Sequence, residues 1–198
     1  MVEQLLENLR RESLAASIPI MDDDSLQFLT EFVSEHGCRR MLEVGTAVGY
    51  STVSIAAASE DLEIVTLEVD PQRHRQAVNN IAMAGLSSRI TAILADARQY
   101  ETDEMFDIIL LDGPKAHNSE LLHRYERNLR EGGYFIIDDV YFHGFIEKPH
   151  VVTSRRLMRL VKRFQKFQEE IENNDCYECT RINLGDGLLI ARKKENVL

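Results

Sequence analysis

Short apolar runs alternate with stretches of helical spacing along most of the chain, and this alternation limits the folds open to it. The runs are RMLEV (40–44), EIVTLEV (63–69), RITAILA (89–95), FDIILL (106–111) and YFIID (134–138). Repeated βα units predict a parallel sheet with helices on both faces, joined by right-handed crossovers. The closing segments CYECTRINL and LLIARK flank a Gly-Asp-Gly turn and indicate a β-hairpin. We therefore expect an α/β fold with a doubly wound, mostly parallel seven-stranded sheet and an antiparallel strand from the C-terminal hairpin.

The helical stretches are expected at 2–15, 51–58, 119–130 and about 153–172, with the pair Gly132-Gly133 closing the third. The 198 residues fit one domain, of which residues 1–36 form an N-terminal helical segment. The first helix can pack on its own domain or contribute Leu5, Leu6 and Leu9 to contact with a second copy.

Hydropathy and cysteine usage predict a cytoplasmic protein. No apolar run approaches the roughly 18 residues that suggest a membrane span, and the acidic N-terminus is unlike a signal or transit peptide. Three cysteines, an odd number without a secretory signal, favour a reducing compartment. Cys176 and Cys179 have CxxC spacing but no further ligands nearby for zinc, so we interpret them as two strand cysteines.

The net charge of −10 disfavours indiscriminate binding of polyanions. The helix at 153–172 departs from this average, because it carries a basic cluster of Arg155, Arg156, Arg159, Lys162, Arg163 and Lys166. These residues fall largely opposite the apolar stripe, as on any solvated helix. A surface that receives the phosphate backbone of an RNA is the second interpretation.

Ligands of doubly wound sheets bind beyond the carboxyl ends of the strands, so residues that follow each strand are the candidates. After the first strand, Glu43-x-Gly45-x-x-x-Gly49 lets backbone approach a ligand closely. It is not the G-x-G-x-x-G pattern of dinucleotide sites. A glutamate there would repel a phosphate but can pair with an ammonium group, which favours a cofactor that carries an amino acid. A glycine turn needed only for packing is the alternative.

Acidic residues also follow the second and third strands. Glu68 can accept hydrogen bonds from two ribose hydroxyls. Its alternative role, capping the next helix, is already supplied by Asp70 before Pro71. Asp96, after the third strand, can accept from an adenine amino group or cap a short turn. The second and third strand ends thus complete a candidate nucleotide site.

Three carboxylates follow the fourth and fifth strands. Asp112 ends one strand, and Asp138 and Asp139 end the neighbouring strand one βα unit later. Carboxylates crowded at one sheet edge repel each other, and a divalent cation with oxygen ligands, usually Mg²⁺, relieves the repulsion. The alternative is that these residues only cap turns. Lys115 follows a Gly-Pro break and can face the same point; the roles of His117, Asn118 and His143, substrate contact or solvent-facing loop, stay open.

The segments LEVGTAVGYS, TLEVD and ADA together resemble the class I S-adenosylmethionine-dependent methyltransferases, which have a Rossmann-like fold. LLDGPKAHN, GGYFIIDDVYFHG and GDGLLIARK narrow the resemblance to the cation-dependent O-methyltransferases of the catechol and caffeoyl-CoA type, over nearly the whole chain. Within that family, IPIMDDDSLQFL, SRRLMRLVKRF and GDG look most like the bacterial enzymes that convert 5-hydroxyuridine to 5-methoxyuridine at the wobble position of tRNA.

The resemblance implies an O-methyltransferase with S-adenosylmethionine and Mg²⁺ as cofactors. It implies metal ligands at Asp112, Asp138 and Asp139, and a catalytic base at Lys115. The cofactor-binding residues implied by it and by the strand-end reading are Met21, Glu43, Gly45, Ser51, Glu68, Asp96, Ala97 and Asp112. The chain departs from the family at Asp139, where Asn is usual, and at Gly113-Pro114, which changes the local backbone.

The acceptor and assembly are expectations of the same kind. The resemblance implies the anticodon region of tRNA as the partner and a homodimer as the assembly, with a small catechol-like acceptor as the alternative. A nicotinamide-dependent oxidoreductase predicts a G-x-G-x-x-G turn, which the sequence lacks. A catalytically silent nucleotide-binding module gives no reason to keep Lys115 and all three carboxylates.

Overall fold

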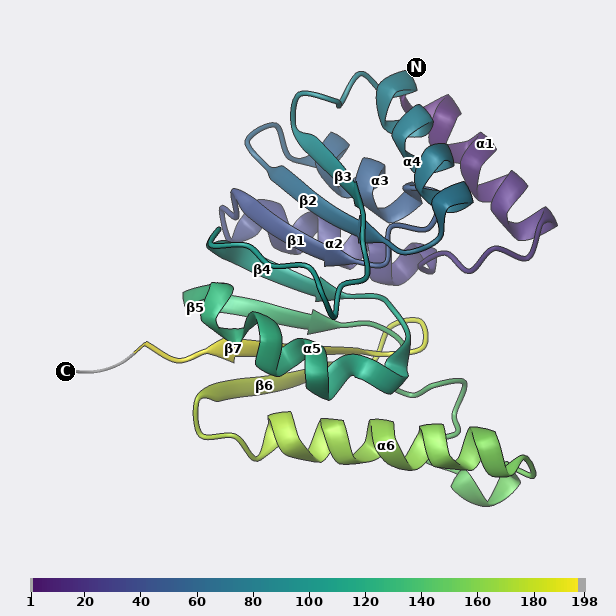
Figure 1. The fold of residues 1–198 in the computed structure, drawn as a ribbon, viewed down its shortest axis with the longest axis vertical. Coiled ribbons are helices and arrows are strands. Elements are labelled where there is room, and N and C mark those ends of the chain that lie inside the picture. Colours follow the sequence, from purple (N-terminus) through teal and green to yellow (C-terminus); the bar gives the residue numbers. More distant parts are fainter. Residues whose placement is uncertain (1, 196–198) are drawn as a thin grey trace.

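The computed structural model describes residues 2–195, which form one mixed sheet of seven strands in the order β3-β2-β1-β4-β5-β7-β6 (Figure 1). The first five strands are mutually parallel, and β7 is antiparallel to both neighbours. The expected fold is therefore confirmed. The strands are β1 (Arg40–Val44), β2 (Glu63–Glu68), β3 (Ile90–Leu94), β4 (Phe106–Leu111), β5 (Leu129–Ile137), β6 (Tyr177–Ile182) and β7 (Leu188–Lys193).

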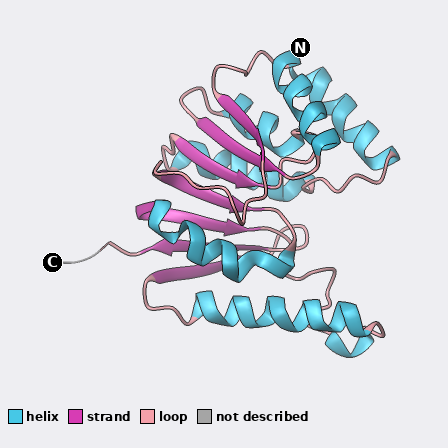
Figure 2. Ribbon diagram, viewed as in Figure 1, coloured by secondary structure: helices cyan, strands magenta, loops and turns pink. Residues whose placement is uncertain are grey.

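Six α-helices cover the two faces of the sheet in the part of the chain described (Figure 2). Buried side chains of the first four belong to one core, and those of the last two belong to the other. The helices are α1 (Val2–Ala15), α2 (Asp23–Glu35), α3 (Tyr50–Ala58), α4 (Pro71–Met83), α5 (Asn118–Tyr125) and α6 (Arg155–Glu172), with short 3₁₀ turns η1 (Lys115–His117), η2 (Glu126–Asn128) and η3 (Pro149–Val151).

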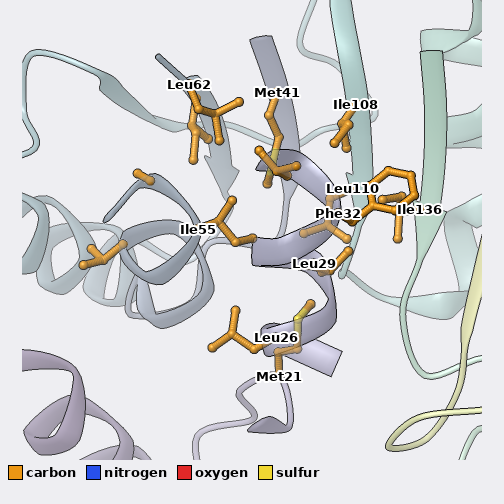
Figure 3. Packing of buried hydrophobic residues seen from close by; sticks show 14 of the residues in the cluster. Met21, Leu26, Leu29, Phe32, Met41, Ile55, Leu62, Ile108, Leu110 and Ile136 are labelled. Carbon is orange, nitrogen blue, oxygen red and sulfur yellow. The ribbon is translucent and has the colours of Figure 1, made fainter. Parts of the chain in front are cut away.

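Alternate residues of each strand point into the two cores, which explains why the strands read as continuous apolar runs. On one face, Leu29 and Phe32 of α2 pack against β4 and β5 residues such as Leu110 (Figure 3). On the other face, Phe164 and Phe167 of α6 lie fully buried against the sheet. Each such side chain contributes roughly 1.5–3 kcal/mol when it leaves water, so the strand ends stand on a rigid base.

Helix α1 packs on its own domain, which is one of the two arrangements that the sequence allows. Leu9 is buried, and Leu5 and Leu6 pack against the first core. Arg10 adds an exposed ion pair with Asp23 at the start of α2, at 2.6 Å. Within the monomer Leu9 is therefore buried, whereas Leu14 is 56% exposed.

The predicted helix at 119–130 is wrong at its C-terminal end. Helix α5 stops at Tyr125, and β5 begins at Leu129, before the two glycines that were expected to close the helix. The side-chain amide of Asn128 donates to the carbonyls of Thr102 and Glu104 at 2.8 and 2.9 Å, which ties this segment to the loop before β4. The glycines instead form an irregularity within β5.

The geometry of that irregularity shows why glycine is needed. The β4–β5 register shifts between Phe106 and Ile108, and Gly132 has a φ of +74°. A Cβ on Gly133 would lie 2.9 Å from the carbonyl oxygen of Asp107. A glycine pair read from sequence as a helix stop therefore serves a β-bulge, which the same residue type also favours.

Among residues 2–195, no helix combines the length and the apolar character required to cross a membrane.

Candidate active site

A cavity of about 460 Å³ opens at the carboxyl ends of the parallel strands. It spans the point between β1 and β4 where the strand order reverses, the usual ligand position in doubly wound sheets. Most of the residues predicted for a cofactor, a metal and a catalytic base line it together: Met21, Gly45, Glu68, Asp96, Ala97, Asp112, Lys115, Asp138 and Asp139. One cavity therefore joins the candidate nucleotide site and the carboxylate cluster.

The glycine turn after β1 is shaped by a backbone contact. Gly45 has a φ of +106°, and a Cβ there would overlap the carbonyl of Asp112. Gly49, with a φ of +86°, precedes the first residue of α3. Both positions need glycine because L-residues with side chains rarely adopt such φ values. The turn therefore lies directly against the backbone of the segment that carries Asp112.

Glu43 and Ser51 lie beneath the cavity and do not line it. The Glu43 side chain is fully buried and accepts hydrogen bonds from Ser51 at 2.7 Å, from Thr66 at 2.5 Å and from Thr52. Burial raises the pKa of this carboxyl, while the three hydroxyls oppose the rise. This arrangement does not leave Glu43 free for the expected direct contact with an ammonium group. Its hydrogen bonds instead link the end of β1 to α3 and β2.

Glu68 faces the cavity with both carboxylate oxygens anchored to backbone. One oxygen accepts from the amide of Ala47 at 2.8 Å, and the other accepts from the amide of Asp70 at 2.8 Å. Each carboxylate oxygen has a further lone pair. The side chain is thus held in one orientation and can still accept two hydroxyl donors, as the predicted ribose role requires.

Asp96 reaches the cavity together with an arginine that the sequence analysis did not single out. Arg98 donates to both carboxylate oxygens, at 3.0 and 2.5 Å, and lowers the pKa of Asp96. Arg98 and Arg73 also line the cavity. The spacing of two residues between Asp96 and Arg98 was the available signal. The amino group of a nucleotide base that binds Asp96 has to share the carboxylate with the Arg98 guanidinium.

Asp112, Asp138 and Asp139 meet at the opposite end of the cavity. They each offer a carboxylate oxygen within 4.8 Å of the others, and Asp138 is only 2% exposed. Burial, and then the charge of Asp139, raises the pKa of Asp138 to about 7. Burial and the charge of Asp138 likewise raise the pKa of Asp112 well above its usual value. The cluster therefore lacks sufficient positive charge of its own.

These carboxylates fit a divalent cation. One oxygen of Asp138, Oδ1, is buried without a hydrogen-bond partner among the described residues. An unpartnered buried oxygen next to two further carboxylates is a donor set of the hard, anionic kind that Mg²⁺ and Mn²⁺ prefer. This is the only group of three or more potential metal ligands within residues 2–195. Cys176 and Cys179 form no such group.

Lys115 is the buried cation beside the cluster. Its side chain is 8% exposed, and Nζ donates to the carbonyl oxygen of Asp138 at 2.8 Å. Nζ also lies 3.2 Å from Oδ2 of Asp139. The Gly-Pro break before η1 turns the chain so that this side chain returns to the cavity, as the spacing predicted. Lys115 is thus placed to exchange a proton with a group bound at the carboxylates.

The structure gives different environments to His117, Asn118 and His143, the three residues whose roles stayed open. His117 lines the cavity. Asn118 is fully buried, and both polar atoms of its side chain lack a partner among the described residues, so a solvent-facing role is wrong for it. The His143 side chain is 72% exposed, yet its ring nitrogen Nδ1 lies 3.4 Å from a carboxylate oxygen of Asp186.

Ionisation of Asp138 is expected to lower the free energy of unfolding of the metal-free protein as pH rises from about 4 to about 7. The pKa of Asp138 is about 7 in the fold and near 3.8 otherwise, so between these values the folded state binds more protons than the unfolded state. Asp138→Asn removes this component. Its melting temperature relative to wild type should therefore increase between pH 5 and pH 8, as measured by thermal unfolding in EDTA. A difference that does not change with pH would contradict the assigned shift.

Comparison with known proteins finds similar chains over nearly the whole length of this one. A family model for O-methyltransferases matches residues 2–194. The caffeoyl-CoA O-methyltransferase of Populus kitakamiensis is 24% identical over 188 residues, which cover 89% of this chain and 78% of the relative. The catechol O-methyltransferase of Mycobacterium tuberculosis is 27% identical over 157 residues, which cover 74% and 71%.

Solved structures agree with these relatives. An O-methyltransferase from Bacillus cereus, solved in complex with SAH, superposes with a TM-score of 0.82 at 28% identity and covers 96% of this chain and 91% of its own. A Staphylococcus aureus protein assigned as a caffeoyl-CoA O-methyltransferase has a TM-score of 0.91 at 28% identity, with coverage of 95% and 91%. The likeness extends over nearly the whole fold that carries the cavity.

Proposed function

The chain belongs to the O-methyltransferase family, and on this premise we propose that it moves a methyl group from S-adenosylmethionine to a tRNA hydroxyl with the help of Mg²⁺. The observation that carries the proposal is the joining of a nucleotide-type pocket and a three-carboxylate cluster in one cavity. The proposed acceptor is 5-hydroxyuridine at the wobble position, and the product is 5-methoxyuridine.

The cofactor half of the cavity suits S-adenosylmethionine, which supplies an electrophilic methyl carbon. Glu68 is oriented to accept from the ribose, and Asp96 and Ala97 are placed for the adenine. Gly45 offers backbone where the chain bends toward Asp112, and Met21 closes the apolar side. Glu43 and Ser51 act from below, because their mutual hydrogen bond keeps the glycine turn in place.

The acceptor half suits a hydroxyl that has a second oxygen beside it. Asp112, Asp138 and Asp139 would hold Mg²⁺, which when bound lowers the pKa of a hydroxyl in contact with it. Three side-chain ligands leave open positions, because Mg²⁺ takes six oxygens. The adjacent hydroxyl and carbonyl of 5-hydroxyuridine, or the two hydroxyls of a catechol, match this requirement.

Lys115 is the proposed base for that hydroxyl. Its amine approaches the carboxylate cluster to 3.2 Å and is screened from water by burial. As the neutral amine, Lys115 can take the proton while the acceptor oxygen attacks the methyl carbon and the cofactor leaves as S-adenosylhomocysteine. General base catalysis typically contributes 10²–10⁴-fold. Positioning of the two substrates in one cavity supplies a further part of the rate.

The surface beside the acceptor half supports an RNA acceptor. All six basic residues of α6 named above are exposed. Arg156, Arg159 and Arg163 line a shallow groove of about 460 Å³ together with Ala116 of η1, the residue that follows Lys115. Arg163 lies against η1, with a guanidinium nitrogen 3.4 Å from the Ala116 carbonyl. A basic groove that starts next to the proposed base suits the phosphate backbone on either side of a target nucleotide.

The deciding experiment offers both acceptor classes to the same enzyme. Wild-type protein is incubated with labelled S-adenosylmethionine, Mg²⁺ and either tRNA that carries 5-hydroxyuridine or a simple catechol, followed by nucleoside mass spectrometry or product chromatography. We expect 5-methoxyuridine in the tRNA reaction. Label that enters the catechol and not the tRNA would move the assignment to the small-molecule alternative, which the names of the curated relatives favour.

The double variant Arg155→Glu, Arg156→Glu tests whether the basic helix contacts RNA. Phosphate contacts make binding salt-dependent. We therefore expect the variant to bind tRNA at least about tenfold more weakly at low salt and with a shallower salt dependence. Methylation of the catechol, where detectable, should not change. Equal tRNA affinity and equal salt slopes for variant and wild type would exclude this surface.

A further inference from the structure

The turn between β6 and β7, residues 185–187, lies at the same sheet edge as the carboxylate cluster. Because β7 runs antiparallel to β5, the start of β7 pairs beside the carboxyl end of β5, with Leu189 opposite Ile137. The residues that follow Ile137 are Asp138 and Asp139, and we call residues 138–143 the carboxylate loop. The Gly-Asp-Gly sequence of the turn is not used by the proposed chemistry.

The turn holds the carboxylate loop by backbone and side-chain hydrogen bonds. The amide of Val140 donates to the carbonyl of Gly187 at 3.0 Å, and the amide of Tyr141 donates to the carbonyl of Asp186 at 2.8 Å. Farther along, the amide of His143 donates to Oδ2 of Asp186 at 2.6 Å. Asp186 therefore contacts the loop through its backbone carbonyl and through its carboxylate, which also lies 3.4 Å from the His143 ring nitrogen Nδ1.

The loop adopts a conformation that needs such support. Asp139, Phe142 and His143 have φ values of +53°, +49° and +56°. Non-glycine residues adopt these values rarely, and they persist when surrounding contacts determine the backbone. One of the three is itself a proposed metal ligand. The direction of its carboxylate thus depends on contacts made by the residues that follow it.

The glycines of the turn permit this close approach. Gly187 has a φ of +84°, and a Cβ there would lie 2.6 Å from two ring carbons of Tyr141. A Cβ on Gly185 would overlap the carboxylate of Asp22, the N-cap of α2. From the other side, Gln168 of α6 donates to the carbonyl of Val140 at 2.8 Å. The loop is therefore enclosed between the turn and α6.

We propose that Asp186 is a positioning residue that sets the metal affinity of the carboxylate cluster by fixing the loop that carries Asp138 and Asp139. The inference rests on the metal site of the proposed function and adds a residue outside the donor set. Partners that orient metal ligands typically change metal affinity 10–100-fold when they are removed. Asp186 acts through the His143 amide, and its carboxylate does not belong to the cluster of potential ligands.

The test measures Mn²⁺ and S-adenosylhomocysteine separately by titration calorimetry on the full chain. Asp186→Ala is expected to bind Mn²⁺ roughly tenfold or more weakly, with S-adenosylhomocysteine affinity unchanged. Asp186→Asn keeps an oxygen for the His143 amide and should recover most of the Mn²⁺ affinity. Asp175→Ala, at an exposed site before β6, is the matched control and should bind both as wild type does.

The outcomes separate the two levels of inference. Failure of the wild-type protein to bind Mn²⁺ would contradict the proposed metal site itself. Wild-type binding that Asp186→Ala leaves intact would overturn the positioning role alone, as would an equal loss of Mn²⁺ and S-adenosylhomocysteine. If Asp186→Ala does not fold, Asp186→Glu retains the charge and displaces the acceptor by one methylene. Weaker Mn²⁺ binding with unchanged S-adenosylhomocysteine binding in that variant supports the proposal, and unchanged Mn²⁺ binding contradicts it.

Discussion

Asp112→Asn is expected to abolish Mn²⁺ binding and to lower the methylation rate by roughly 10³-fold, since metal ions supply several kcal/mol of stabilisation at tenfold per 1.4 kcal/mol. The side chain keeps its size but loses its negative charge, so two carboxylates remain at the cluster. Burial raises the pKa of the Asp112 carboxyl, which means that its charge is unfavourable in the metal-free fold. The variant should therefore melt at the same or a higher temperature than wild type without metal.

Calorimetry with two ligands, together with a control variant, distinguishes loss of the metal from loss of the fold. Calorimetry with Mn²⁺ should show no binding to Asp112→Asn. S-adenosylhomocysteine should still bind through Glu68 and Asp96, and any loss of its affinity measures the cofactor contact implied for Asp112. Asp103→Asn, an exposed aspartate in the loop before β4, is the control and should retain full activity. Activity of wild-type enzyme that survives EDTA undiminished would show that the cluster does not serve a catalytic metal.

Lys115→Met should lower kcat by about 10²–10⁴-fold, the usual contribution of a positioned base. Methionine preserves much of the aliphatic packing but removes the amine that contacts the Asp138 carbonyl. Loss of a cation beside three carboxylates should leave Mn²⁺ affinity equal or tighter, because the carboxylates then attract a metal more strongly. Single-turnover rates and Mn²⁺ titrations together measure both effects.

Lys115→Arg separates charge from base. Arginine keeps the positive charge near Asp139 but stays protonated in proteins, so its rate should fall almost as far as that of the methionine variant. An arginine variant with wild-type kcat would show that Lys115 acts only through its charge, and that another group or water removes the proton.

The sheet was predictable because five buried strands and a hairpin each leave a local signal. The order of the strands across the sheet was less predictable. It depends on which crossovers bury both faces of the sheet, whereas the sequence shows only the order of the strands along the chain. The error at Gly132-Gly133 has a specific cause. Glycine with positive φ ends helices and also forms bulges, and the deciding contact, from Asn128 to the loop before β4, joins residues distant in sequence.

The site was predictable to the extent that it follows strand ends. Asp112, Asp138 and Lys115 meet as their spacing implied. Glu43 lies at the end of β1, as expected, but its orientation depends on hydroxyls of α3 and β2 that no local pattern reveals. Asn118 is similar: its burial follows from the way η1 and α5 meet the sheet and not from its neighbours in sequence.

The position of β7 between β5 and β6 determines when a growing chain can complete its sheet. Residues 188–193 leave the ribosome after every other strand, yet they fill an interior place in the sheet. Until they arrive, β6 has no hydrogen-bonded neighbour, because β7 is the only strand that it pairs with among the described residues. Domains generally fold as units during synthesis, so a prematurely ended product that lacks this strand has an incomplete catalytic edge and an unpaired β6. Such products should be inactive and prone to proteolysis, which confines methyl transfer to chains made to the end of β7.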